Sequence, residues 1–90
     1  MTKVIELYPK DVKAYFFRGI AYYNFQDYKN AISDYTKIIE LNPKDADAYY
    51  NRGLAKNENG DNNGACDDWR KAYSLGDLDA KDLLNKHCKY

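Results

Sequence analysis

Residues 12–45, VKAYFFRGIAYYNFQDYKNAISDYTKIIELNPKD, are followed at 46–79 by ADAYYNRGLAKNENGDNNGACDDWRKAYSLGDLD. The two stretches align without a gap, and eleven of their 34 positions are identical, whereas ordinary residue usage gives roughly two by chance. The identical pairs are Ala14/Ala48, Tyr15/Tyr49, Arg18/Arg52, Gly19/Gly53, Ala21/Ala55, Asp27/Asp61, Ala31/Ala65, Asp34/Asp68, Lys37/Lys71, Leu41/Leu75 and Asp45/Asp79. A repeat of this length indicates a stack of similar units, because one unit alone cannot bury its apolar face.

Each copy of the repeat predicts two helices. We expect them at about 12–25 and 28–41 in the first copy and at about 46–59 and 62–74 in the second. In the second helix of each copy, apolar residues recur at helical spacing: Ile32, Tyr35, Ile38 and Ile39, then Ala65, Trp69, Ala72 and Tyr73. An aspartate, whose side chain accepts hydrogen bonds from free N–H groups, stands at the start of each helix: Asp11, Asp27, Asp45 and Asp61.

Gly19 and Gly53 occupy the same position of the two copies, inside the first expected helix of each. Glycine inside a helix costs about 1 kcal/mol relative to alanine, so its recurrence at the repeat period indicates a geometric need. A residue without a side chain lets a partner helix approach closely. We expect the small residues Ala31 and Ala65 of the second helices to face the two glycines.

Large and small residues follow one order in both copies. The first copy has Tyr15, Arg18, Gly19, Tyr22, Ala31, Tyr35, Ile38 and Pro43, and the second has Tyr49, Arg52, Gly53, Lys56, Ala65, Trp69, Ala72 and Asp77. With its period of 34, this order resembles the tetratricopeptide repeat family. The chain departs from the family at Arg18 and Arg52, usually leucine-like, at Lys56, usually tyrosine, and at Asp77, usually proline. The resemblance implies an all-α, right-handed α-solenoid of antiparallel helix hairpins.

The resemblance also divides the chain into four parts. We expect a truncated upstream repeat to leave the tail of its second helix at 1–8, two repeats at 12–45 and 46–77, and a C-terminal capping helix at 78–90. Solenoids need such a cap to shield their last apolar face. Its apolar stripe is formed by Ala80, Leu83, Leu84, His87 and Cys88.

Members of the family bind peptides on the concave face, which the first helix of each hairpin lines. Carried over by register, this groove is expected to contain Lys13, Phe16, Ile20, Tyr23, Asn24, Tyr50, Asn51, Leu54, Asn57 and Lys81. Rings bury area at low entropic cost and amides hold a peptide backbone. The alternative is that the apolar members, Phe16, Ile20, Tyr23 and Leu54, belong to the core. The function implied is a protein- or peptide-binding scaffold.

One subgroup of the family holds the free carboxylate of chaperone tails with lysine and asparagine at fixed positions of the first helices. In this chain two of these positions hold Phe16 and Ile20, and only Asn51 and Lys81 match. We therefore do not expect chaperone-tail binding.

The two cysteines, Cys66 and Cys88, lie on either side of the turn near Leu78. An antiparallel helix pair brings such residues together, so they form either a disulfide or two buried thiols that act as small apolar residues. With His87 they do not complete four zinc ligands, and we expect no metal site.

Composition excludes several other functions. The 90 residues hold 14 basic and 14 acidic side chains, so no net field attracts nucleic acid or an anionic membrane. No apolar run approaches the roughly 20 residues that span a bilayer. There is no glycine-rich phosphate loop and no nucleophile with a base in a recognised motif. We expect neither enzymatic activity nor a cofactor.

Self-assembly is the alternative function. About two and a half repeats are few for a solenoid, which usually needs three or more. We expect an open N-terminal end to leave apolar surface at Val4, Ile5 and Leu7 incompletely covered. Association end to end, or exchange of helices between copies, relieves such exposure.

Overall fold

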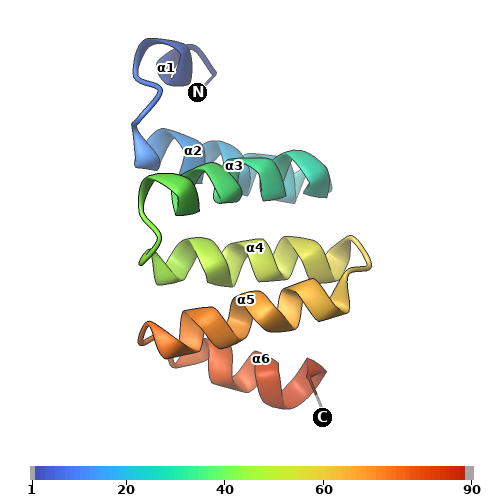
Figure 1. Cartoon of the computed structure of the whole chain (residues 1–90). Coiled ribbons are helices and arrows are strands. Elements are labelled where there is room, and N and C mark those ends of the chain that lie inside the picture. Colours follow the sequence, from blue (N-terminus) through green and yellow to red (C-terminus); the bar gives the residue numbers. More distant parts are fainter. Residues whose placement is uncertain (1, 89–90) are drawn as a thin grey trace.

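The computed structural model describes residues 2–88, with side chains from residue 5 onward, and this part of the chain contains six helices and no strand. They are α1 (Thr2–Leu7), α2 (Val12–Asn24), α3 (Tyr28–Leu41), α4 (Ala46–Glu58), α5 (Asn62–Ser74) and α6 (Asp79–His87). The helices follow one another along an elongated stack, from α1 at one end to α6 at the other (Figure 1). Each packs against the next in the chain.

The four central helices lie within one residue of their predicted bounds, and the predicted aspartate caps are confirmed. The Asp11 carboxylate accepts from the backbone N–H of Lys13 at 3.1 Å, and Asp45 accepts from that of Ala48 at 3.2 Å. Asp27 and Asp61 cap α3 and α5 in the same way. Such caps satisfy N–H groups that have no partner inside the helix. The start of each helix is therefore determined by a residue of its own sequence.

The core lies between the two helices of each hairpin and is built by equivalent residues of the two repeats. In α3, Ala31, Tyr35 and Ile38 are at most 1% exposed, and their equivalents in α5 are fully buried. These equivalents are Ala65, Trp69 and Ala72. The apolar period of the second helices therefore faces inward at these positions, whereas Ile32 and Ile39 are only half-buried and Tyr73 is 41% exposed.

The glycines provide the close approach expected of them, but their neighbours differ from the prediction. A Cβ atom on Gly19 would lie 2.9 Å from Tyr35 Cε1, and one on Gly53 would lie 2.7 Å from Trp69 Cδ1 and overlap Trp69 Nε1. The nearest atoms thus belong to aromatic rings and not to Ala31 or Ala65. Large rings project further from α3 and α5 than alanines do, so the rings reach the glycine backbone first.

The two ends of the stack differ. At the N-terminal end Ile5 is 9% exposed, which corrects the expectation that it is uncovered, while Leu7 is 65% exposed. The side chain of Val4 lies outside the described residues. At the other end α6 turns Ala80 fully inward and the His87 ring lies 5.6 Å from that of Trp69. The amphipathic pattern predicted for the last helix is confirmed.

We predict that Gly53→Ala destabilises the protein more than Gly19→Ala, measured by urea unfolding. At Gly53 the new methyl group overlaps the indole, and overpacking costs roughly 1–3 kcal/mol against a helix-propensity gain of about 1 kcal/mol. At Gly19 the two effects are expected nearly to cancel. In a Trp69→Phe background the cost of Gly53→Ala is expected to shrink. An unchanged cost there would mean that the indole is not the obstacle.

Candidate functional site

The side of the stack formed by α2 and α4 carries two hollows. The first, of about 190 Å³, lies at the start of these helices and is lined by Val12, Lys13, Phe16, Phe17, Asp45 and Asp47. The second, of about 240 Å³, lies further along and is lined by Ile20, Tyr23, Asn24, Tyr35, Asn51 and Leu54. We refer to the surface that contains both as the groove.

Seven of the ten predicted groove residues line these two hollows. Lys13 and Phe16 lie at the first, and Ile20, Tyr23, Asn24, Asn51 and Leu54 at the second. The other three lie elsewhere. Tyr50 packs on the α5–α6 cluster, Asn57 accepts a 3.3 Å hydrogen bond from Asn62, and Lys81 is exposed on α6.

The apolar residues of the groove belong to both the surface and the core. Phe16, Ile20, Tyr23 and Leu54 are all partly exposed. The rings of Phe16 and Tyr35 pack edge to face, with their centroids 6.1 Å apart. The centroids of the Tyr23 and Tyr28 rings are 5.4 Å apart. Because core contacts hold these side chains from behind, their outer faces are presented in fixed positions.

Tyrosine hydroxyls in and beside the groove stay protonated at neutral pH. Burial, followed by the charge of Glu58, raises the pKa of Tyr23. Burial, followed by the charges of Asp79, Asp77 and Asp82, raises the pKa of Tyr50. Burial also raises the pKa of Tyr35 to about 12. Tyr23, which lines the second hollow and is partly exposed, therefore offers a neutral phenol as a hydrogen-bond donor.

Each hairpin also contains a buried ion pair that the sequence analysis did not identify. Arg18 donates from Nε to Asp34 at 2.8 Å and from Nη2 at 2.6 Å. Arg52 makes the same two bonds to Asp68, at 2.8 and 2.7 Å. The hydrogen bonds to these carboxylates raise the pKa of both guanidinium groups. The arginines that depart from the family's leucine-like position thus have fixed partners across the hairpin.

The second ion pair extends into a small network. Lys56 Nζ lies 3.1 Å from Asp68 Oδ2, and Arg52 Nη1 donates to Thr36 Oγ1 of the preceding hairpin at 3.2 Å. Asp68 is only 4% exposed. Asp68 therefore lies against α4, whereas its neighbour Asp67 is exposed and pairs with Arg70.

A signal for these pairs was present in the repeat itself. Arg18 and Arg52 are identical between the copies, as are Asp34 and Asp68, and each arginine precedes its aspartate by 16 residues. Charges repeated at one spacing on facing helices are candidates for a pair.

Comparison with known proteins agrees with this architecture. Two models of the tetratricopeptide repeat match the chain, one over residues 12–45 and the other over 34–67. Together they span more than half of the 90 residues. The chain belongs to the tetratricopeptide repeat family. The predicted fold class, an all-α solenoid of antiparallel hairpins, is confirmed.

Solved tetratricopeptide repeat (TPR) structures match nearly the whole chain. The first TPR of Spaghetti (RPAP3), bound to the HSP90 peptide SRMEEVD, aligns with a TM-score of 0.88 and 25% identity over 94% of this chain and 69% of that one. The Arabidopsis OM64 TPR domain aligns with a TM-score of 0.85 and 27% identity, over 96% and 75%. The comparison with curated proteins returned no match.

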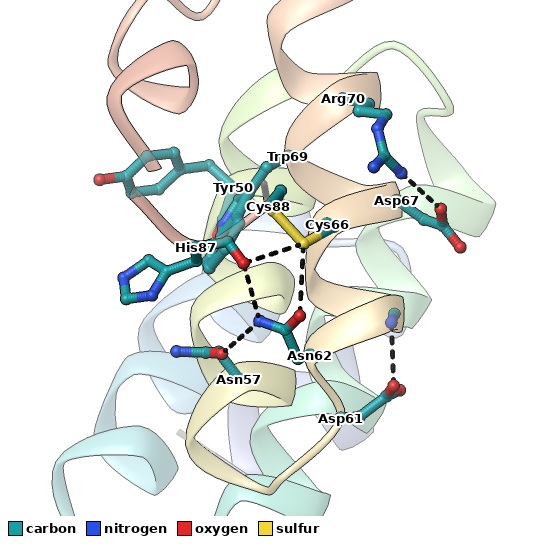
Figure 2. The surroundings of a disulfide bond; sticks show 11 residues. Tyr50, Asn57, Asp61, Asn62, Cys66, Asp67, Trp69, Arg70, His87 and Cys88 are labelled. Atoms are coloured by element: carbon teal, nitrogen blue, oxygen red, sulfur yellow. Dashed lines mark hydrogen bonds and ion pairs between the residues drawn. A yellow bond between two sulfur atoms is a disulfide. The ribbon is translucent and has the colours of Figure 1, made fainter. Parts of the chain in front are cut away.

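In this TPR chain a disulfide joins the end of α6 to α5. Cys66 of α5 is bonded to Cys88, the residue that follows α6 (Figure 2). Of the two open interpretations of the cysteines, the structure has the disulfide. Cys66 Sγ also lies 3.9 Å from the carbonyl oxygen of His87. A disulfide sulfur carries no proton, so this approach is a packing contact in the oxidised protein.

Residues 2–88 contain neither a cluster of metal-ligating side chains nor a membrane-spanning helix. No group of three or more His, Cys, Asp or Glu side chains there is arranged to hold a metal ion. None of the helices in this range is both long enough and apolar enough to cross a membrane.

We predict that Asp68→Asn lowers the free energy of unfolding strongly, whereas Asp67→Asn leaves it nearly unchanged. Removing one partner of a buried ion pair typically costs about 3–5 kcal/mol, since Arg52 and Lys56 then keep their charges without a carboxylate. An exposed ion pair such as Asp67–Arg70 contributes about 0–1 kcal/mol. Urea unfolding of the two variants measures the difference, and equal costs would contradict the role assigned to Asp68.

We predict that reduction of the disulfide loosens α6 before it affects the rest of the chain. The cysteines are separated by 22 positions, and closing a loop of this length stabilises a protein by about 3 kcal/mol. Hydrogen exchange of α6 amides is expected to accelerate in reducing buffer, while amides of α2 and α3 keep their protection. In a Cys66→Ser/Cys88→Ser variant, the α6 amides should exchange as fast as in the reduced protein, and the reductant should not change their rate.

Proposed function

We propose that the groove of this TPR chain binds an extended segment of another protein, and that the chain acts as a scaffold. The observation that carries the proposal is the second hollow, where apolar side chains and two amides converge. Ile20 and Leu54 supply apolar surface there, and Asn24 and Asn51 supply hydrogen-bonding groups. Such a combination suits an extended peptide, because side chains fill the hollow while amides pair with its backbone.

A related structure supports the proposal, because the first TPR of Spaghetti holds a peptide from HSP90. We do not extend that peptide's chemistry to this chain. Two of the positions that hold a chaperone tail's carboxylate in the family are occupied by Phe16 and Ile20, which carry no charge and donate no side-chain hydrogen bond. The groove is therefore proposed for a different peptide.

The proposed role is non-catalytic and is limited to protein partners. The histidine, His87, lies against Trp69 at the capping helix and far along the stack from the first hollow. The formal net charge of zero gives no general attraction to nucleic acid or to anionic lipid.

We predict that a mixed pool of short peptides with blocked ends shifts amide NMR signals in the groove, at Phe16, Tyr23 and Asn51. The double variant Asn24→Ala/Asn51→Ala is expected to weaken binding about tenfold, since a hydrogen bond contributes about 1 kcal/mol. Asn63→Ala, on the exposed start of α5, serves as the matched control. If the groove signals stay still at saturating peptide, the receptor function fails.

Self-association is a second candidate function, favoured by one feature of the surface. Leu7 and Tyr8 are 65% and 64% exposed and, with Pro9 to Asp11, line a hollow of about 500 Å³. Exposed apolar surface of this kind often marks contact with another chain.

If copies associate through this surface, the mass measured by sedimentation rises with protein concentration, and Leu7→Lys/Tyr8→Lys abolishes the rise. The variant Phe17→Lys/Phe25→Lys provides the control, because it introduces the same two charges at other exposed apolar residues. A constant monomer mass at all concentrations would leave only the receptor function.

A further inference from the structure

Carboxylates lie among the aromatic side chains of the first hollow, and other carboxylates act on tyrosines at and beyond the second. In the first hollow, Asp45 and Asp47 of the second repeat lie across from Phe16 and Phe17 of the first. Asp45 is partly engaged as the cap of α4, whereas Asp47 is exposed on the first turn of that helix.

The pattern continues towards the capping helix. Tyr23 lines the second hollow, and the charge of Glu58, after burial, raises the pKa of its phenol. After burial, the charges of three aspartates at the start of α6 also raise the pKa of Tyr50: Asp79, Asp77 and Asp82. Figure 2 shows the Tyr50 side chain extending away from the disulfide, with its hydroxyl outermost.

These carboxylates differ from those on the other side of the molecule. Within the described part of the chain, every carboxylate in an ion pair lies on α3 or α5: Asp34, Glu40, Asp67 and Asp68. In the same range, no ion pair is formed by Asp47, Glu58, Asp79 or Asp82. Of the residues that line the two hollows, Lys13 is basic and Asp45 and Asp47 are acidic, so acidic groups exceed basic ones there although the chain as a whole is neutral.

Helix stability explains some of these positions but not all of them. Asp47, Asp79 and Asp82 lie in the first turns of α4 and α6, where a carboxylate favours the positive end of the helix dipole. Glu58 is the last residue of α4, where a negative charge is unfavourable for the same reason. The helix dipole therefore does not explain Glu58, whose charge acts on Tyr23.

We propose that the groove selects an extended peptide whose Lys or Arg side chains alternate with apolar residues. The inference rests on the proposed function and names the chemistry of the ligand. A guanidinium or ammonium group gains from the face of an aromatic ring and from a carboxylate at once, and a Phe or Tyr beside an Asp or Glu supplies both. The apolar residues of the peptide then occupy the hollows between these contacts.

Because Asp47, Glu58 and Asp82 are exposed, they are expected to act as charges on the rim of the interface. Charges on the rim of an interface act mainly on the encounter rate and on the choice of partner, and salt screens them. Binding of a basic peptide is therefore expected to weaken as the salt concentration rises, while binding of a neutral peptide changes little.

The test uses the full chain and three matched pools of short peptides with blocked ends. The pools share the same mixture of apolar residues at alternate positions and carry Arg, Gln or Glu at the positions between them. Fluorescence anisotropy at low salt is expected to rank them Arg, then Gln, then Glu, with the Arg pool at least about tenfold tighter than the Glu pool, since several weak ion pairs add.

Variants locate the effect on the groove. Asp47→Asn/Glu58→Gln/Asp82→Asn is expected to weaken binding of the Arg pool about tenfold and to leave the Gln pool unchanged. Glu6→Gln/Glu40→Gln/Asp67→Asn removes the same number of charges from exposed positions elsewhere and is expected to change neither. If the first triple variant does not fold, Glu58→Gln alone is used, since it relieves the end of α4 and is not expected to destabilise it.

The outcomes separate the two proposals. Equal affinity for the three pools, or equal losses in the groove variant and its control, overturns the choice of a basic peptide and leaves the binding scaffold standing. Tighter binding of the Glu pool does the same. If no pool binds at any salt concentration, the scaffold function and the ligand chemistry fail together.

Discussion

The close approach of a glycine backbone to an aromatic ring is the contact on which the two hairpins depend. At Gly53 the Trp69 indole lies so near that no Cβ fits without overlap, and Tyr35 lies almost as near to Gly19. The ring fills the space between two helices, so it sets their distance and excludes water from the crossing. Trp69 also donates its N–H to the Tyr50 carbonyl at 3.3 Å, so its buried polar atom is satisfied.

The buried arginine–aspartate pairs complement this apolar contact. Desolvating two charges offsets much of their attraction, so such pairs contribute little net stability compared with well-packed apolar side chains. Their effect is on geometry: a bidentate pair is satisfied in only one arrangement of the two helices. Arg18 with Asp34 and Arg52 with Asp68 thus define the rotation of each first helix against its second, and Arg52 also reaches Thr36 in the neighbouring hairpin.

The groove follows from that rotation. Once the ring and the ion pair hold one side of α2 and α4 against their partners, another side of both helices is directed to the same surface. Phe16, Tyr23 and Leu54 then share their contacts between core and hollow. The disulfide between Cys66 and Cys88 holds α6 against α5, so the aspartates at the start of α6 stay close enough for their charges to act on Tyr50.

The sequence alone determined the elements of this protein. The period of 34, the aspartate caps and the apolar spacing act within a few residues of one another, so the four central helices and the family could be predicted. Seven of the ten residues expected to face a groove line the two hollows. Which side chains meet across a hairpin depends on how two helices are rotated, and local spacing does not contain that information. For this reason only the tertiary structure decided that Trp69 and not Ala65 meets Gly53, that Asp68 is buried against Arg52, and that Cys66 and Cys88 are joined.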